Sequence, residues 1–279
     1  MNFSNLEEFV TGMTVPKLNQ GNLRNVEIPI PPLPEQKRIV SILDRAFEAI
    51  DKAKANAQQN LKNAAALFES YSDNLYQKLI EENKNDLLGD LAKLVRGPFG
   101  GSLKKSMFVE KGYAVYEQRN AIGNFIDDFR YFIDEQKYNE MKRFSVNKGD
   151  ILMSCSGTIG KFTIINDNFK NGIINQVLLK ITPDNNKVIN KYLLFALSNF
   201  IKDGSSHSKG AAIKNIIAVK ELKKINIPLL DINEQQQIVQ KLDVLSAETK
   251  KLESIYQQKI DDLEELKKSI LQKAFAGEL

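Results

Sequence analysis

The sequence IPIPPLPEQKRIVSILD at residues 28–44 recurs in modified form as IPLLDINEQQQIVQKLD at residues 227–243. The two copies are 199 positions apart throughout, so that Gln36 aligns with Gln235. A repeat of this length determines the architecture of a chain and is interpreted before local features. It predicts two similar segments that flank one unlike segment.

Length and composition indicate a globular protein of about two structural units. The chain has 279 residues, of which 27% are charged and 42% hydrophobic, as is usual for soluble proteins. Its one cysteine, Cys155, excludes an intrachain disulfide and favours a reducing compartment. The sequence has no 18-residue apolar run and no signal pattern at its N-terminus. We therefore expect a cytoplasmic protein that does not contact a membrane.

The net charge of +4 is unevenly distributed. Residues 89–226 contain 22 Lys/Arg and 13 Asp/Glu, whereas the rest of the chain contains 17 and 22. A localised basic surface favours a polyanionic partner such as nucleic acid.

Both copies of the repeat predict the start of a helix. The prolines within residues 28–34 keep that stretch extended, and the first helix is expected to begin near Glu35. In the second copy Asp231 or Asn233 can cap the helix, and Glu234 lies near the positive end of its dipole.

Neither residues 35–88 nor residues 233–276 contain glycine or proline. Apolar residues recur there at steps of three and four, the pattern of a coiled coil. As single helices they would span about 70 and 65 Å at 1.5 Å per residue, too long for one globular core to cover. They are expected to pair with each other or with copies of themselves; the alternative is a solvent-exposed amphipathic pair. The predicted pairing positions are Ile39, Leu43, Ala46, Ile50, Ala53, Leu61 and Phe68 in the first segment, and Leu242, Leu245, Leu252, Tyr256, Leu263 and Ile270 in the second.

The segment between the helices has short β-like runs separated by turn residues. These runs are YAVYEQ at 113–118, FRYFI at 129–133, DILMSC at 150–155, KFTIIN at 161–166 and GIINQVLLKI at 172–181. One helix is predicted at 187–203. The pattern predicts a mixed α+β domain of about 140 residues, a normal domain size.

No residue pattern indicates catalysis, a metal site or a cofactor. The single histidine, His207, lies far from Cys155 in sequence, which argues against a nucleophile pair. The glycine-rich stretches at 97–105 and 156–161 do not complete GxxxxGK[ST] or GxGxxG, the two glycine-rich motifs that bind nucleotides. They are either tight turns or places where backbone N–H groups approach phosphate oxygens beside lysines.

The sequence Tyr116-Glu117-Gln118-Arg119-Asn120 has side chains that recognise base edges in DNA. It could equally be an exposed strand edge, and basic residues among aromatic ones are also compatible with RNA. The candidate DNA-contacting residues are Arg96, Lys104, Lys105, Tyr116, Gln118, Arg119, Asn120, Arg130, Tyr131, Ser156, Thr158, Lys161, Asn175 and Gln176, with Arg143 of the same kind.

The repeated PxxxEQxxIVxxLD phrase, each copy followed by a long helix, resembles the specificity subunit of type I restriction-modification systems. GPFGGSL at 97–103, KGDILMS at 148–154, SGTIGK at 156–161 and the closing stretch at 210–229 resemble the target recognition domain of that family. The resemblance implies an α+β fold in which recognition domains are joined by two long antiparallel helices that set the distance between half-sites. It also implies a non-catalytic role.

In that family, methyltransferase subunits and a motor-nuclease subunit supply the chemistry, and double-stranded DNA is the target. Members usually carry two recognition domains, whereas this chain is expected to have one. The expected division is a remnant of a first domain at 1–34, a central spacer helix at 35–88, a target recognition domain at 89–230 and a distal spacer helix at 231–279. Two copies could form a dimer with a palindromic bipartite target. A coiled-coil adaptor whose basic domain binds a protein or RNA is the alternative, and a stand-alone enzyme is disfavoured by the missing motifs.

Overall fold

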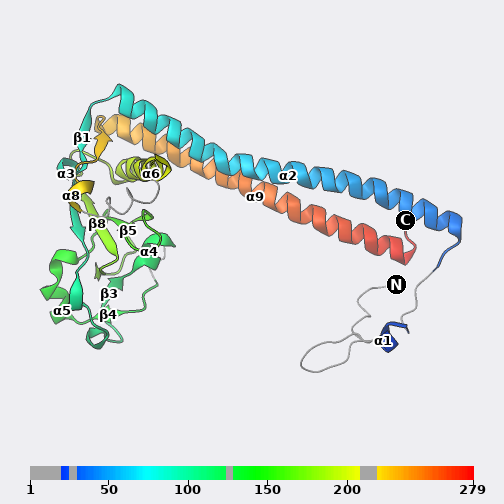
Figure 1. Ribbon diagram of the computed structural model, residues 1–279, viewed down its shortest axis with the longest axis horizontal. Coiled ribbons are helices and arrows are strands. Elements are labelled where there is room, and N and C mark those ends of the chain that lie inside the picture. The colour runs from blue at the N-terminus through cyan, green and yellow to red at the C-terminus, as the bar shows by residue number, and fades with distance from the viewer. Residues whose placement is uncertain (1–19, 25–29, 124–127, 208–218) are drawn as a thin grey trace. The chain divides into compact units, whose positions relative to one another are not determined.

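The computed structural model describes residues 20–24, 30–123, 128–207 and 219–279. In these ranges the chain has an α+β fold in which long helices accompany β-sheets (Figure 1). It divides into two compact units, one of residues 1–68 with 246–279 and one of residues 69–245.

Two long helices, α2 (Leu33–Glu82) and α9 (Ile232–Ala276), confirm that both predicted segments are helical. The predicted end of the first helix at residue 88 is wrong: α2 ends at Glu82, because residues 85–87 pair as a strand with Asn226–Pro228. In the first unit the two helices pack side by side and run antiparallel (Figure 1). Asp51 accepts a hydrogen bond from Lys267 at 2.8 Å, and Glu264 accepts one from Lys54 at 2.5 Å. From Asp51 to Lys54 the chain moves three residues forward on α2, and their partners move three residues backward on α9, from Lys267 to Glu264. The two helices therefore run antiparallel.

The buried stripe on α2 has the seven-residue spacing of a coiled coil. Ile50, Ala57 and Ala64 are all less than 10% exposed. The register of the ion pairs places Ala57 level with Ile260 of α9, which is also buried. At this level a small side chain on α2 therefore meets a larger one on α9.

The predicted pairing residues other than Leu252 are buried or half-buried. They are Ile39, Leu43, Ala46, Ile50, Ala53, Leu61, Phe68, Leu242, Leu245, Tyr256, Leu263 and Ile270. The prediction for Leu252 is wrong, since that side chain is 38% exposed. On α9 the covered stripe runs from Thr249 through Glu253 to Tyr256, which turns position 252 toward solvent.

The first helix begins at Leu33, two residues before the predicted start, with Pro34 in its first turn. In the second copy Asp231 is the capping residue rather than Asn233. Its carboxylate accepts a hydrogen bond from the Glu234 N–H at 2.9 Å, and the Glu234 carboxylate accepts one from the Asp231 N–H at 3.2 Å. This reciprocal capping box satisfies two donors at the start of α9.

The repeated glutamine makes the same local hydrogen bond in both copies. The side-chain amide of Gln36 donates to the Pro31 carbonyl at 2.7 Å, and that of Gln235 donates to the Leu230 carbonyl at 2.9 Å. The similarity extends upstream, because α1 (Gln20–Arg24) and α8 (Val219–Leu222) start 199 positions apart. The sequence repeat is therefore also a repeat of local structure.

Only the second glutamine is fully buried. Gln235 also donates to the Lys187 carbonyl at 2.9 Å and accepts from the Ile189 N–H at 2.8 Å. These bonds join the start of α9 to the segment before α6 (Asn190–His207).

The described residues of the second unit form three sheets. A four-stranded antiparallel sheet has the order β2-β8-β5-β6, formed by Ala92–Arg96, Leu178–Pro183, Ile151–Ser154 and Phe162–Ile164. A three-stranded sheet has the order β4-β3-β7, formed by Phe132–Ile133, Tyr113–Tyr116 and Gly172–Ile174, with β3 parallel to β7. The chain enters and leaves the domain through an antiparallel pair, β1 (Asn85–Leu87) and β9 (Asn226–Pro228). The second unit also contains the short α-helices α3 (Leu88–Leu91), α4 (Gln118–Ile122) and α5 (Glu135–Glu140).

The three-stranded sheet separates two hydrophobic clusters. Alternate residues of a strand face opposite sides, so Ala114 and Tyr116 join one cluster and Val115 joins the other. The first cluster includes Leu152 of β5, which ties the two larger sheets together.

Two of the predicted β-strand runs are not continuous strands in the structure. The run at 172–181 is two strands in different sheets, because the Asn175 side chain accepts a hydrogen bond from the Val177 N–H at 3.2 Å and forms a turn. The run at 113–118 ends at Tyr116, and α4 begins at Gln118. The predicted helix at 187–203 is α6, and β2 was not predicted.

Candidate nucleic-acid interface

Four loops of the α+β unit meet around the carboxyl ends of β3 and β7. Since these strands are parallel, residues 117–120 and 175–177 lie at the same edge, and the Asn175 N–H donates to the Tyr116 carbonyl at 3.0 Å. A third loop, 97–99, packs so tightly that a Cβ on Gly97 would lie 1.8 Å from the Asn175 carbonyl oxygen. The fourth, 156–160, is joined through the Gln118 side chain. These four segments are called the loop cluster below.

The start of α4 forms a capping box. The Asn120 side-chain oxygen accepts a hydrogen bond from the Glu117 N–H at 2.7 Å, and the Glu117 carboxylate accepts from the Asn120 N–H. The Asn120 side-chain amide donates to the Asp128 carbonyl at 3.1 Å. The segment expected to recognise bases is thus fixed by its own side chains.

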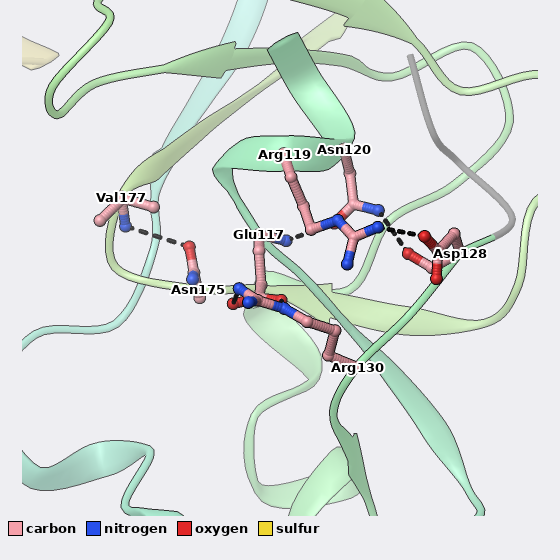
Figure 2. A network of polar contacts seen from close by, with 7 residues as sticks. All are labelled: Glu117, Arg119, Asn120, Asp128, Arg130, Asn175 and Val177. Carbon is pink, nitrogen blue, oxygen red and sulfur yellow. Dashed lines mark hydrogen bonds and ion pairs between the residues drawn. The ribbon is translucent and has the colours of Figure 1, made fainter. Parts of the chain in front are cut away.

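Two ion pairs surround this box (Figure 2). Arg130 donates to both carboxylate oxygens of Glu117, at 2.9 and 2.8 Å. Arg119 donates to the carboxylate of Asp128. Hydrogen bonding to Glu117 raises the pKa of Arg130. Both arginines already have a carboxylate partner in the free protein, so each would have to share or exchange it to contact a base.

The loop at 156–160 is held from two sides. The Gln118 side-chain amide donates to the Ser156 carbonyl, and the Ser154 hydroxyl donates to the Thr158 carbonyl at 2.6 Å. Gly157 and Gly160 adopt φ of +58° and +74°, values that favour glycine. The side chains of Ser156, Thr158 and Lys161 are exposed, so this SGTIGK stretch presents polar groups on a rigid turn.

Two of the predicted DNA-contacting residues lie inside the protein. Tyr116 is fully buried, and its hydroxyl donates to the Lys170 carbonyl at 2.8 Å. Burial raises the pKa of Tyr116 to about 12. Asn120 is 1% exposed. In this conformation neither side chain can reach a base, because the run that looked like a strand edge is a strand end followed by a capped helix.

Other predicted residues are accessible. The side chains of Lys104, Lys105 and Gln176 are exposed, as is that of Lys161. None of their side-chain groups forms a hydrogen bond or ion pair within the described part of the chain. Tyr131 is half-buried, stacks on Phe108 with ring centroids 4.5 Å apart and packs against the hydrophobic cluster that contains Val115.

Phe99 is a residue that the sequence did not single out. It lies in the loop cluster and is 69% exposed, beside the end of β2 where Arg96 lies. The sequence signal that could have identified Phe99 is its position in a predicted turn, between Pro98 and the two glycines at 100 and 101.

The sequence matches a known family over most of its length. That family is described as type I restriction modification DNA specificity domain, and the match covers residues 1–63 and 81–264. The chain belongs to this family. No helix in the described ranges has the length and hydropathy needed to cross a bilayer.

Similar relatives are specificity subunits. The chain is 26% identical to the type I restriction enzyme EcoBI specificity subunit of Escherichia coli, over 96% of this chain and 62% of the relative. It is 30% identical to the putative specificity subunit S.HindORF215P of Haemophilus influenzae, over 86% of this chain and 60% of the relative. The chain therefore spans about 60% of the length of these relatives.

Solved structures share the fold. The HsdS subunit from Thermoanaerobacter tengcongensis superposes with a TM-score of 0.65 at 20% identity, covering 99% of this chain and 67% of that one. A chain from a structure concerning complex assembly and conformational transition of the type I R-M system gives a TM-score of 0.70 at 20% identity, over 96% of this chain and 66% of that one.

Proposed function

We propose that the α+β unit binds double-stranded DNA and selects a target sequence on behalf of a type I restriction-modification enzyme. The observation that carries the proposal is the loop cluster, in which exposed polar side chains such as Ser156 and Gln176 project from turns fixed by internal hydrogen bonds, with the exposed Lys161 directly after the turn at 156–160. Preorganised polar groups of this kind suit base recognition, and nearby lysines suit phosphate contacts.

The role proposed for the chain is recognition rather than catalysis. We assign target recognition to residues 89–230 together with β1, the role of spacer helices to α2 and α9, and the end of a preceding recognition domain to the residues before α2. The helices would set half-site separation and bind methyltransferase subunits, which in turn bring the motor-nuclease subunit. The names of the relatives, as specificity subunits of restriction enzymes, support these assignments.

We further propose that two copies of the chain assemble to form a bipartite reader. One recognition unit contacts one half-site, and a target in two halves requires two such units. Light scattering should give a dimer, alone or with the methyltransferase subunit; a monomer under both conditions would contradict it.

The recognition proposal is tested by binding to duplex DNA. With methyltransferase subunits present, selection from random duplexes should enrich one bipartite sequence, and affinity should fall steeply with salt. Gln118→Ala and Arg119→Ala should weaken binding to the selected sequence by about 1–3 kcal/mol for each bidentate hydrogen-bonded pair with a base that the substitution removes. They should weaken binding to random DNA less.

Gln257→Ala is a matched control, because that glutamine lies on α9 and bonds only to Asp261 among the described residues. If all three variants behave alike on selected and random DNA, Gln118 and Arg119 do not recognise bases. If no duplex binds and a protein or RNA is retained instead, the chain is an adaptor.

A further inference from the structure

A pocket of about 280 Å³ opens at the end of β2, next to the loop cluster. Its walls include Leu94, Arg96, Pro98, Phe99, Arg143 and Phe144. Gly97, which also lines it, packs against the Asn175 turn. The pocket therefore shares one wall with the proposed DNA-binding loops.

Arg96 has donors without acceptors in the part of the chain that the structure describes. Its Nε and Nη1 atoms are buried and have no hydrogen-bond partner there. Its Nη2 atom makes only a long contact of 3.5 Å to the Cys155 carbonyl. Leaving N–H groups of a charged side chain buried and unpaired is costly, which points to an acceptor that the described residues do not supply.

The charge of the pocket is uncompensated. In the described ranges no carboxylate forms an ion pair with Arg96 or Arg143, whereas Arg119 and Arg130 each have one. Two guanidinium groups without a counter-charge at one small opening favour an anion. Arginine matches the oxygens of phosphate with two parallel hydrogen bonds.

The other walls favour a phosphate that carries an organic group. The Phe99 ring centroid lies 5.8 Å from the Arg96 guanidinium carbon, and that of Phe144 lies 6.0 Å from the Arg143 guanidinium carbon. An exposed aromatic ring beside a cation suits contact with a sugar or base next to the phosphate. The volume is close to the lower end of the ~300–1,000 Å³ seen for ligand pockets, so one such group fits.

We propose that this pocket binds one backbone phosphodiester of the DNA. Arg96 and Arg143 supply the positive charge that attracts it, and Phe99 covers the adjoining sugar. The proposal rests on the proposed DNA-binding function and adds a sequence-independent contact that positions the domain on the duplex.

The experiment measures affinity for a fixed duplex across a salt series. Each phosphate contact contributes about 0.9 to the slope of log K against log salt. Between 50 and 200 mM salt, the wild type should therefore lose about 3.5-fold more affinity than Arg96→Met, and about as much more than Arg143→Gln. The effect of each substitution should be the same on selected and random sequences. Lys137→Gln is the control, since Lys137 is already paired with Glu140 at 3.1 Å.

A stability measurement separates this role from a structural one. Arg96→Met removes unpaired buried donors, so its thermal midpoint should equal or exceed that of the wild type. A lower midpoint together with an unchanged salt slope would overturn the proposal. Arg143 is exposed, so Arg143→Gln keeps the fold intact and provides the same slope measurement if Arg96→Met does not fold.

Two further results distinguish the source of the phosphate. If inorganic phosphate or adenosine monophosphate raises the thermal midpoint of the wild type but not of Arg96→Met, while DNA binding is unaffected, the pocket takes a free phosphate and the proposal is wrong. If wild-type protein binds duplex DNA and both arginine variants keep its slope, only this inference fails. If wild-type protein binds no duplex at all, the proposed function fails.

Discussion

The buried glutamine of the second repeat copy offers a sharp test of why the phrase recurs. Replacing Gln235 by methionine preserves side-chain length and approximate volume but removes all polar atoms. Three hydrogen bonds disappear, leaving the Ile189 N–H and the carbonyls of Lys187 and Leu230 without this partner.

The size of the effect follows from these three bonds. Each contributes about 1 kcal/mol net, and a buried group left unpaired costs about 1–3 kcal/mol. Since Gln235 is fully buried, we expect the free energy of unfolding to fall by about 3 kcal/mol or more. For a unit of this size, that decrease lowers the thermal midpoint by about 6–12 °C.

The chain provides its own control. Gln36→Met makes the same chemical change at the equivalent position, where the structure has one hydrogen bond, to Pro31, and a partly exposed side chain. It should cost less than about 1 kcal/mol, because water can replace the missing partner. Calorimetry on both variants measures the contrast. Equal destabilisation at the two positions would refute the argument that the second glutamine fixes helix α9 to the domain.

Two other predictions concern packing and pH. Ala57 is 2% exposed, so Ala57→Leu should destabilise the helix pair by about 1–3 kcal/mol through overpacking. Circular dichroism melts measure this change in stability. Ala55→Leu, at an exposed position, should change the stability little. Burial raises the pKa of Tyr116 to about 12, whereas in the unfolded chain it is about 10. The unfolded state therefore loses its proton first, and stability should fall as pH rises from about 10 to 12, by up to about 2–3 kcal/mol from this residue. Tyr116→Phe should be less stable at neutral pH but show a shallower alkaline decline; an identical alkaline slope would contradict the assignment.

The helices could be predicted because their signal is local. Steps of three and four among apolar residues, with no glycine or proline, determine both the helices and most of their buried stripe. The exposure of Leu252 was not predicted, because positions 252 and 253 both follow Thr249 at a step of three or four. In the structure Glu253, and not Leu252, lies on the covered stripe of α9.

The site was harder to predict because its contacts join distant parts of the chain. The Glu117–Arg130 pair depends on β3 pairing with β4, and the turn at Asn175 depends on a side-chain hydrogen bond that divides an apparently continuous strand. Residue type alone suggested that Tyr116 and Asn120 face DNA. Their burial follows from the alternation of β3 and from the helix cap, neither of which composition reveals.

The two-stranded sheet of β1 and β9 has a thermodynamic consequence. It pairs Leu87 with Asn226, so it closes a loop that contains the whole α+β domain. The entropy cost of closing so long a loop grows only with the logarithm of its length, and doubling the length would add about 0.6 kcal/mol. Residues can therefore be inserted into or removed from the surface loops of this domain with little effect on the free energy of joining its two ends.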